Sequence, residues 1–274
     1  MIKTFMLMHP QSAILASKSA FRSKHVTLKK ISCGTTKVKG SDLSEAADFH
    51  PTYASLNSCL FETSVILTLW EHSEELLGDD HIAILHSDVN IKGKSGEIWK
   101  KLNKSLDENP NRPIALTIPN TFDALWKDWV VPDNHMLRPK YDPYNIHCFD
   151  NGIFVWELIK KYDSDLYEWA FDTQPEMIYA HQFACTKKIF NSLGASLYKI
   201  VESLRLRDIG FWTPHMFERM ISLYLARQGD PILTTAFLHY QSSGVYGPGD
   251  HSLYGPRPLR YYHTVCKAIR ANNS

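Results

Sequence analysis

The chain has 274 residues, 44% of them hydrophobic, and a formal net charge of +1 from 30 basic and 29 acidic side chains. This length and content suffice for one large domain or two small ones. The near balance of charges argues against polyanion binding, and so against a nucleic-acid partner, as the main function.

The periodicity of apolar residues predicts strands that alternate with helices, which is typical of an α/β protein. In chain order, strands are expected at 1–8, 25–28, 81–88, 113–119, 177–185 and 231–240. Helices are expected at 11–22, 58–77, 97–106, 151–163, 165–171, 187–205 and 214–228. A helix ending at Gly78 and a helix capped by Ser95 are the clearest terminal signals. Residues 33–52 are expected to form a long loop, and residues 241–260 a Gly- and Pro-rich tail.

The spacing of the cysteines and the length of the apolar segments indicate the cellular compartment that we expect. Five cysteines lie far apart, without a C-x-x-C pair, at positions Cys33, Cys59, Cys148, Cys185 and Cys266. This pattern argues against structural zinc and favours reduced thiols in a cytoplasmic protein. The apolar N-terminus is short for a signal sequence, and no stretch approaches the ~20 apolar residues of a membrane span.

The segment His81–Val89 is the most informative part of the sequence. Its apolar run, Ile82 to Leu85, predicts a strand covered on both faces, and the strand ends in His86, Ser87 and Asp88. In open α/β sheets, ligands bind beyond the carboxyl ends of the strands. A carboxylate at that position can bind a divalent cation, which in turn can bind a diphosphate. Asp88 can equally cap a turn, because Ser-Asp is good turn chemistry.

Three further polar clusters are candidates for a site. Asn57 and Glu62 open the predicted helix 58–77, and Tyr179–Gln182, which contains His181, interrupts an apolar strand. His215 to Arg219, with Glu218, opens the helix 214–228. Each has a structural alternative: Glu62 favours a helix N-terminus, His181 suits a core, and Glu218 with Arg219 suits a surface pair. The motifs H-E-x-x-H, G-x-S-x-G, G-x-G-x-x-G and the Walker loop are absent from the sequence.

The order of these motifs resembles one known family. The motifs are a first strand ending in His9, the helix start Asn57–Thr63, the strand ending in His86, the segment Phe183–Phe190, and Gly210–Leu225 with Phe217-Glu218-Arg219. They are similar to the glycosyltransferases of bacterial capsule and lipopolysaccharide gene clusters (the domain-of-unknown-function 4422 type) and to related enzymes of large algal (chlorella) viruses. The similarity covers residues 2–240.

The resemblance implies a single GT-A-like α/β domain with a Rossmann-like mixed central sheet flanked by helices. Its nucleotide-sugar half would span about residues 1–120, its acceptor half about 121–240, and a C-terminal lid 241–274. The usual Asp-x-Asp metal motif corresponds to His86-Ser87-Asp88, so the first acid is missing. The cofactor implied is Mn²⁺ or Mg²⁺, bound by Asp88 with His239 or His251. If the source is viral, the compartment is the host cytoplasm.

The resemblance also implies roles for other residues. Glu218 corresponds to the catalytic base of a sugar transfer from a nucleoside diphosphate sugar to a saccharide acceptor. UDP-sugars are the favoured donors, UDP-xylose among them. Inversion at the anomeric carbon is favoured, and retention stays open. The donor-binding residues would be His9, Asn57, Glu62, His86, Ser87, Asp88 and Arg257. The acceptor-binding residues would be Trp126, His181, Trp212 and His215. Two alternatives stay open: a nucleotidyltransferase, and a non-catalytic or metal-independent protein that binds nucleotide sugars or glycans.

Overall fold

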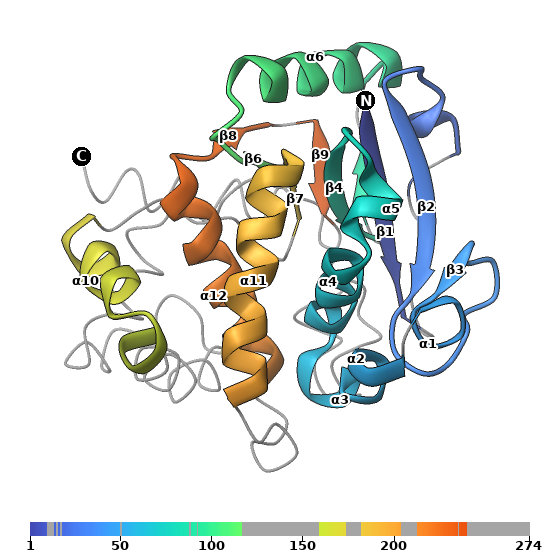
Figure 1. Ribbon diagram of the computed structural model, residues 1–274. Coiled ribbons are helices and arrows are strands. Elements are labelled where there is room, and N and C mark those ends of the chain that lie inside the picture. The colour runs from blue at the N-terminus through green and yellow to red at the C-terminus, as the bar shows by residue number, and fades with distance from the viewer. Residues whose placement is uncertain are drawn as a thin grey trace, which may run out of the picture.

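A computed structural model describes residues 1–9, 14, 16, 18–49, 51–87, 89–91, 93–116, 159–173, 182–203, 213–234 and 236–239 (Figure 1). The described chain is an α/β structure with a mixed central sheet flanked by helices, as the sequence predicts. None of the described helices combines the length and the apolar content needed to cross a membrane.

The central sheet has seven strands in the order β3-β2-β1-β4-β7-β6-β8. Strands β3, β2, β1 and β4 run parallel to one another. Strand β7 is antiparallel to both β4 and β6, and β8 is parallel to β6. A second, two-stranded sheet pairs β5 with β9. The strands are β1 Ile2–Met8, β2 Val26–Ser32, β3 Leu43–Ser44, β4 His81–His86, β5 Val89–Ile91, β6 Ile114–Ala115, β7 Phe183–Cys185, β8 Ile232–Leu233 and β9 Phe237–His239.

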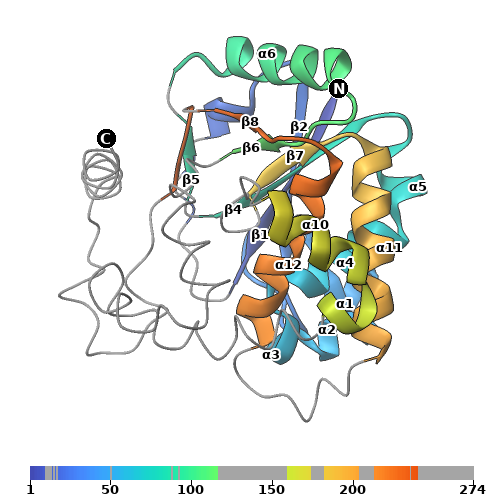
Figure 2. The ribbon, with the colours of Figure 1, turned by 90° about the vertical axis from the view of Figure 1, so that its left-hand side faces the viewer.

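Two hydrophobic cores cover the two faces of the sheet. Alternate residues of β1 point to opposite faces, so Phe5 and Leu7 enter the larger core, whereas Ile2 enters the smaller one. The larger core lies under α4 (Glu62–Glu71), α11 (Lys187–Ser203) and α12 (Thr213–Gln228), which stand side by side in Figure 1. The smaller core includes the buried Trp99 of α6 (Ser95–Glu108) and Val89 of β5. In Figure 2, strand β5 lies on the opposite side of the sheet from α11.

The helices follow the predicted pattern most closely where the apolar periodicity is long. The helices α10, α11 and α12 begin and end within two residues of the predicted bounds. The helical elements are η1 Lys18–Phe21, α1 Glu45–Asp48, α2 Pro51–Ser55, α3 Asn57–Leu60, α4 Glu62–Glu71, α5 Ser73–Leu77, α6 Ser95–Glu108, α10 Ser164–Thr173, α11 Lys187–Ser203 and α12 Thr213–Gln228.

Several predicted elements are wrong in detail. The helix predicted at 58–77 is three helices, because Phe61 has φ 43° and His72 is not helical, although Gly78 with φ 56° ends the last helix as predicted. The loop predicted at 33–52 contains β3, α1 and the start of α2. Ser95 is the first residue of α6 and donates to the carbonyl of Ser19 instead of capping its own helix.

The strand predicted at 231–240 is also wrong as a single element. It is two short strands in different sheets, since β8 joins the central sheet and β9 pairs with β5. An apolar run shows that a segment is buried, but it does not show which strand the segment pairs with.

Candidate functional site

The candidate site lies where the strand order reverses direction. The chain proceeds from β1 to β2 on one side of β1 and then returns to place β4 on the other side. All three strands are parallel, so their carboxyl ends meet at one edge of the sheet. Ligands of open α/β sheets bind in the crevice outside such a reversal point.

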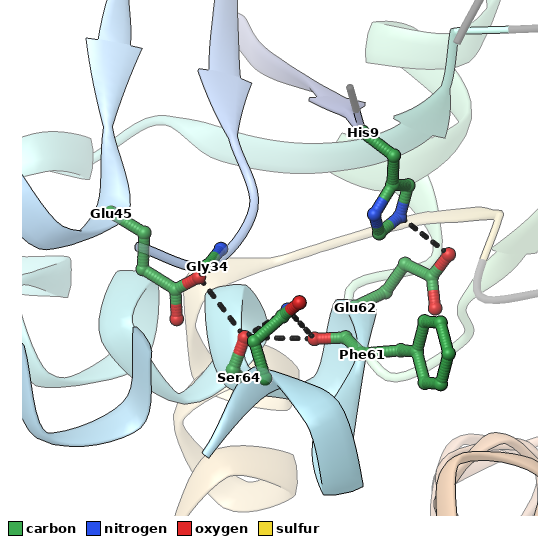
Figure 3. A network of polar contacts seen from close by, with 7 residues as sticks. His9, Gly34, Glu45, Phe61, Glu62 and Ser64 are labelled. Carbon is green, nitrogen blue, oxygen red and sulfur yellow. Dashed lines mark hydrogen bonds and ion pairs between the residues drawn. The ribbon is translucent and has the colours of Figure 1, made fainter. Parts of the chain in front are cut away.

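His9 follows β1 directly and makes the central contact of this edge. Its Nε2 lies 2.9 Å from Oε1 of Glu62, the first residue of α4, and Figure 3 shows the two side chains pointing toward one another. The side chains of His9 and Glu62 are 27% and 18% exposed, so solvent reaches both from one side. The ring of His9 also hydrogen-bonds the thiol of Cys33, which follows β2. Residues after two neighbouring strands and at the start of a helix therefore converge.

The contacts of His9 with Glu62 and Cys33 determine the charge of the site. Burial on its own disfavours the charged ring, but the hydrogen bonds to Cys33 and Glu62 and the charges of these two groups outweigh it and raise the pKa of His9 to about 11. Burial raises the pKa of the Cys33 thiol, although the hydrogen bond from His9 acts in the opposite direction. At neutral pH these shifts favour an imidazolium paired with the carboxylate of Glu62.

Glu62 is aimed at His9 by a strained turn between α3 and α4. Phe61 has φ 43° and ψ −125°, a conformation that costs a non-glycine residue about 1–3 kcal/mol. Its carbonyl accepts hydrogen bonds from Asn57 Nδ2 at 2.9 Å and from Ser64 Oγ at 2.7 Å. The ring of Phe61 packs against that of His9, with centroids 6.2 Å apart. Asn57 thus holds the turn that positions Glu62.

The buried carboxylate of Glu45 supports the turn at Phe61 through Ser64. Glu45, at the start of α1, is completely buried, and its carboxylate accepts a hydrogen bond of 2.6 Å from the backbone N–H of Gly34. Ser64 Oγ lies 3.0 Å from the same carboxylate (Figure 3). Thr68 Oγ1 lies 3.3 Å from it. Burial raises the pKa of Glu45, and the hydrogen bond from Gly34 opposes that rise. Glu45 therefore ties the loop after β2 to the first turns of α4.

The end of β4 supplies the second group of polar side chains. His86 pairs in register with Leu7 of β1, so His86 and Ser87 lie on the same edge as His9. The antiparallel register Ile84 to Phe183 carries Gln182 to the position opposite Leu85. The side chain of Gln182 is completely buried, and neither of its amide atoms has a hydrogen-bond partner among the described residues. Leaving such a group unpaired costs about 1–3 kcal/mol, so we expect a partner from outside the described residues to satisfy it.

The small second sheet brings a distant histidine to this edge. Strand β9 pairs with β5 so that the backbone of His239 lies opposite Val89. Val89 directly follows Asp88 in the sequence. The side chains of Asp88 and His239 lie outside the described part of the structure.

The helix α12 carries the predicted base. It packs against α3 and α4, the two helices on either side of Phe61. Phe217 is completely buried in the larger core, and the adjacent Glu218 is only partly buried. Glu218 therefore lies on a helix in contact with the turn that positions Glu62.

Among the predicted site residues, the structure brings together His9, Asn57 and Glu62, and it places His86 and Ser87 on the same edge. Among the described residues, no group of three His, Cys, Asp or Glu side chains is arranged to bind a metal ion. The predicted residues that lie outside the described structure are Asp88, Trp126, His181, Trp212, His251 and Arg257, together with the side chains of His215 and His239.

Cys33 and Glu45 belong to the candidate site but were not predicted as site residues from the sequence. A signal for Cys33 was present, because it follows β2 as His9 follows β1, and neighbouring parallel strands end at the same edge. Glu45 had no comparable signal, because it stands in a Gly-, Ser- and Lys-rich stretch that is typical of an exposed loop.

Comparison of the chain with models of known protein families finds no match, and comparison with curated protein sequences finds none either.

Proposed function

We propose that this protein is a glycosyltransferase that transfers a sugar from a nucleoside diphosphate donor to a hydroxyl group of a saccharide. The observation that carries the proposal is the meeting of His9, Glu62 and the end of β4 at the reversal point of a Rossmann-like sheet. A diphosphate is an anion, and an imidazolium at this edge would bind one of its oxygens. The GT-A assignment, a UDP-sugar donor and a cytoplasmic location belong to the same proposal.

The donor set suits a divalent cation. A carboxylate from Asp88 and an imidazole from His239, completed by diphosphate oxygens, match the ligand preferences of Mn²⁺ and also suit Mg²⁺. The pairing of β9 with β5 favours His239 over His251, because it places the backbone of residue 239 one residue away from Asp88 in register. When bound, the ion would neutralise the charge that develops on the leaving diphosphate.

Other residues of the chain would accept the proton and bind the donor and the acceptor. Glu218 would accept the proton of the acceptor hydroxyl as its oxygen attacks the anomeric carbon, which gives inversion in a single displacement. His9, held by Glu62, would contact the diphosphate, and the buried amide of Gln182 would donate to or accept from the donor. Trp126, Trp212, His181 and His215 would contact the acceptor.

The first test of this function is a panel of nucleotide sugars, assayed for transfer and for hydrolysis with and without Mn²⁺. We expect Glu218→Gln to lower the rate by about 10²–10⁴-fold and to leave nucleotide affinity unchanged. Glu168→Gln, on the exposed face of α10, is the matched control and should leave the rate unchanged.

Calorimetric titration with nucleoside diphosphates tests the binding site separately. Asp88→Ala and His239→Ala should remove the effect of Mn²⁺ on diphosphate affinity, whereas His251→Ala should retain it. Binding of no nucleoside diphosphate would refute the proposal. Binding without turnover of any sugar would favour a non-catalytic sugar-binding protein, and release of pyrophosphate from a nucleoside triphosphate would favour a nucleotidyltransferase.

A further inference from the structure

The charges of this chain are distributed unevenly, although their sum is close to zero. Eight of the 30 Lys and Arg residues, and none of the 29 Asp and Glu residues, lie within residues 1–41. The remaining residues therefore hold 22 basic and 29 acidic side chains. Such an asymmetry is typical of a protein that presents a charged surface to a partner.

The fold places most of these cations along one side of the molecule. Strand β2 pairs with β3 only at Ile31 and Ser32, and Asp42 bonds the backbone of Lys30. Among the described residues, 26–29 therefore form a free edge of the central sheet. Figure 1 shows β2 at the margin of the sheet, with the turn that follows it beside β3. Seven cations lie on β2, on η1 and the turn that joins it to β2, and on the turn after β2. We call them the basic edge: Lys18, Arg22, Lys24, Lys29, Lys30, Lys37 and Lys39.

The basic edge is exposed to solvent, and its side chains form no ion pair with the part of the chain that the structure describes. All of its members are exposed except Lys30, which is partly buried. Among the described residues, none of the seven has a carboxylate within ion-pair distance; Lys30 instead donates to the carbonyl of Gly40. The eighth cation, Lys3, differs, because it lies 3.5 Å from a carboxylate oxygen of Asp80.

Protection of a free strand edge explains only part of this arrangement. Lysines on an edge strand prevent pairing with other chains, and this accounts for Lys29 and Lys30. It does not account for the five cations outside the strand, or for the absence of any acidic residue over 41 positions.

We propose that the basic edge binds the anionic headgroups of a lipid bilayer and holds the protein at a membrane surface. Strand β2 alone spans about 20 Å, and an extended row of this kind suits a flat surface better than a small ligand. Six of the seven cations are Lys, which act as point charges, whereas Arg is favoured where a phosphate is recognised in a fixed geometry. This inference does not depend on the proposed enzymatic activity.

The composition of the edge disfavours a nucleic acid as the partner. Proteins that bind single strands combine cations with exposed aromatic platforms. The only Phe, Tyr or Trp in residues 18–41 is Phe21, and its ring packs against Trp99 with centroids 5.7 Å apart. The edge therefore offers charge without a surface for base stacking.

The test is co-sedimentation of the full chain with vesicles of phosphatidylcholine alone and with about one-third phosphatidylserine. We expect binding only to the anionic vesicles, and we expect it to weaken steeply as salt shortens the Debye length below about 8 Å. Each cation near the surface contributes about fivefold in affinity, so the variant Lys24→Gln, Lys29→Gln, Lys37→Gln, Lys39→Gln should bind at least about 100-fold more weakly.

The matched control removes the same charge from a different part of the molecule. Lys160, Lys161, Lys188 and Lys199 are exposed residues on the helical side, near or within α10 and α11. The variant with all four changed to Gln should retain most of the vesicle binding, and circular dichroism checks the fold of both variants. Equal losses in the two variants, no binding of the unmodified chain to anionic vesicles, or tighter binding to a DNA duplex at the same salt would each overturn the proposal.

Discussion

At the scale of single residues, the pair His9–Glu62 decides the chemistry of the candidate site. Neither residue is unusual in sequence, because one follows a strand and the other begins a helix. Their contact at 2.9 Å converts a histidine that is ordinarily neutral at pH 7 into a fixed cation. The partner of that cation is a carboxylate that is itself held by the strained turn at Phe61.

This pair can be tested by removing the carboxylate. In Glu62→Gln the pKa of His9 should fall, because the negative charge of Glu62 that helps to stabilise the imidazolium is lost while the hydrogen bond to Cys33 remains. The measurement is an NMR titration of histidine side chains, with a His9→Gln variant to assign the resonance. We also expect the substitution to lower the free energy of unfolding by about 1–3 kcal/mol at pH 6.

The control for this titration uses a second histidine–carboxylate pair. His81 Nε2 lies 2.8 Å from Asp107 Oδ1, and His81 begins β4, at the end of the strand opposite the site edge. Asp107→Asn should leave the titration of His9 unchanged. A His9 resonance that titrates near pH 6.5 in the unmodified protein would contradict the assignment of the cation.

At the scale of elements, the close approach of α4 and α11 fixes the layer that covers the larger core. Gly194 in α11 lies directly against Trp70 of α4, and a Cβ atom built at position 194 would lie 2.1 Å from Cγ of that ring. The helices can pack at this distance only because residue 194 has no side chain. Glycine is otherwise unfavourable inside a helix by about 1 kcal/mol, so its presence here has a packing reason.

Gly194→Ala should therefore destabilise the protein by about 1–3 kcal/mol, because the two helices must separate to admit the methyl group. Gly96 in α6 is the matched control, since a Cβ there meets no atom within 4 Å. Gly96→Ala should leave stability unchanged or raise it by up to about 1 kcal/mol. Urea denaturation measures both, and equal effects of the two substitutions would refute the packing argument.

At the scale of the whole molecule, the titratable groups with perturbed pKa values are all shifted upward. The hydrogen bonds and charges of its partners raise the pKa of His9 against the effect of burial, whereas burial itself raises the pKa of Cys33, Glu45 and Tyr53 in the folded protein. Each group therefore keeps its proton to a higher pH when folded than when unfolded. Where the native state binds more protons, raising the pH favours unfolding.

The free energy of unfolding should consequently decline as the pH rises above neutrality. The contribution of His9 is fully present below its unfolded pKa of 6.5 and is lost as the pH rises through its folded pKa of about 11. Its slope is at most about 1.4 kcal/mol per pH unit. Chemical denaturation at pH 6.5, 8 and 9.5 measures the decline, and Glu62→Gln should flatten it between the first two values; parallel profiles for the two proteins would contradict this account.

The sequence predicted the fold class and the parts of the site that depend on local order. Apolar periodicity is a property of neighbouring residues, so β1, β4, α11 and α12 were predicted near their observed bounds. The position of His86 and Ser87 after an apolar strand likewise placed them at the carboxyl edge of the sheet. The charge asymmetry of the first 41 residues can also be read from the sequence alone.

Only the tertiary structure decided which of these residues meet. The Cys33–His9–Glu62 cluster joins three segments far apart in sequence, and the pairing of β9 with β5 brings residue 239 opposite residue 89. The break at Phe61 and the burial of Glu45 arise from contacts that no local pattern encodes, because their cost is offset by distant partners. Sequence determined the elements and their charges; the long-range pairing of strands and helices determined the site.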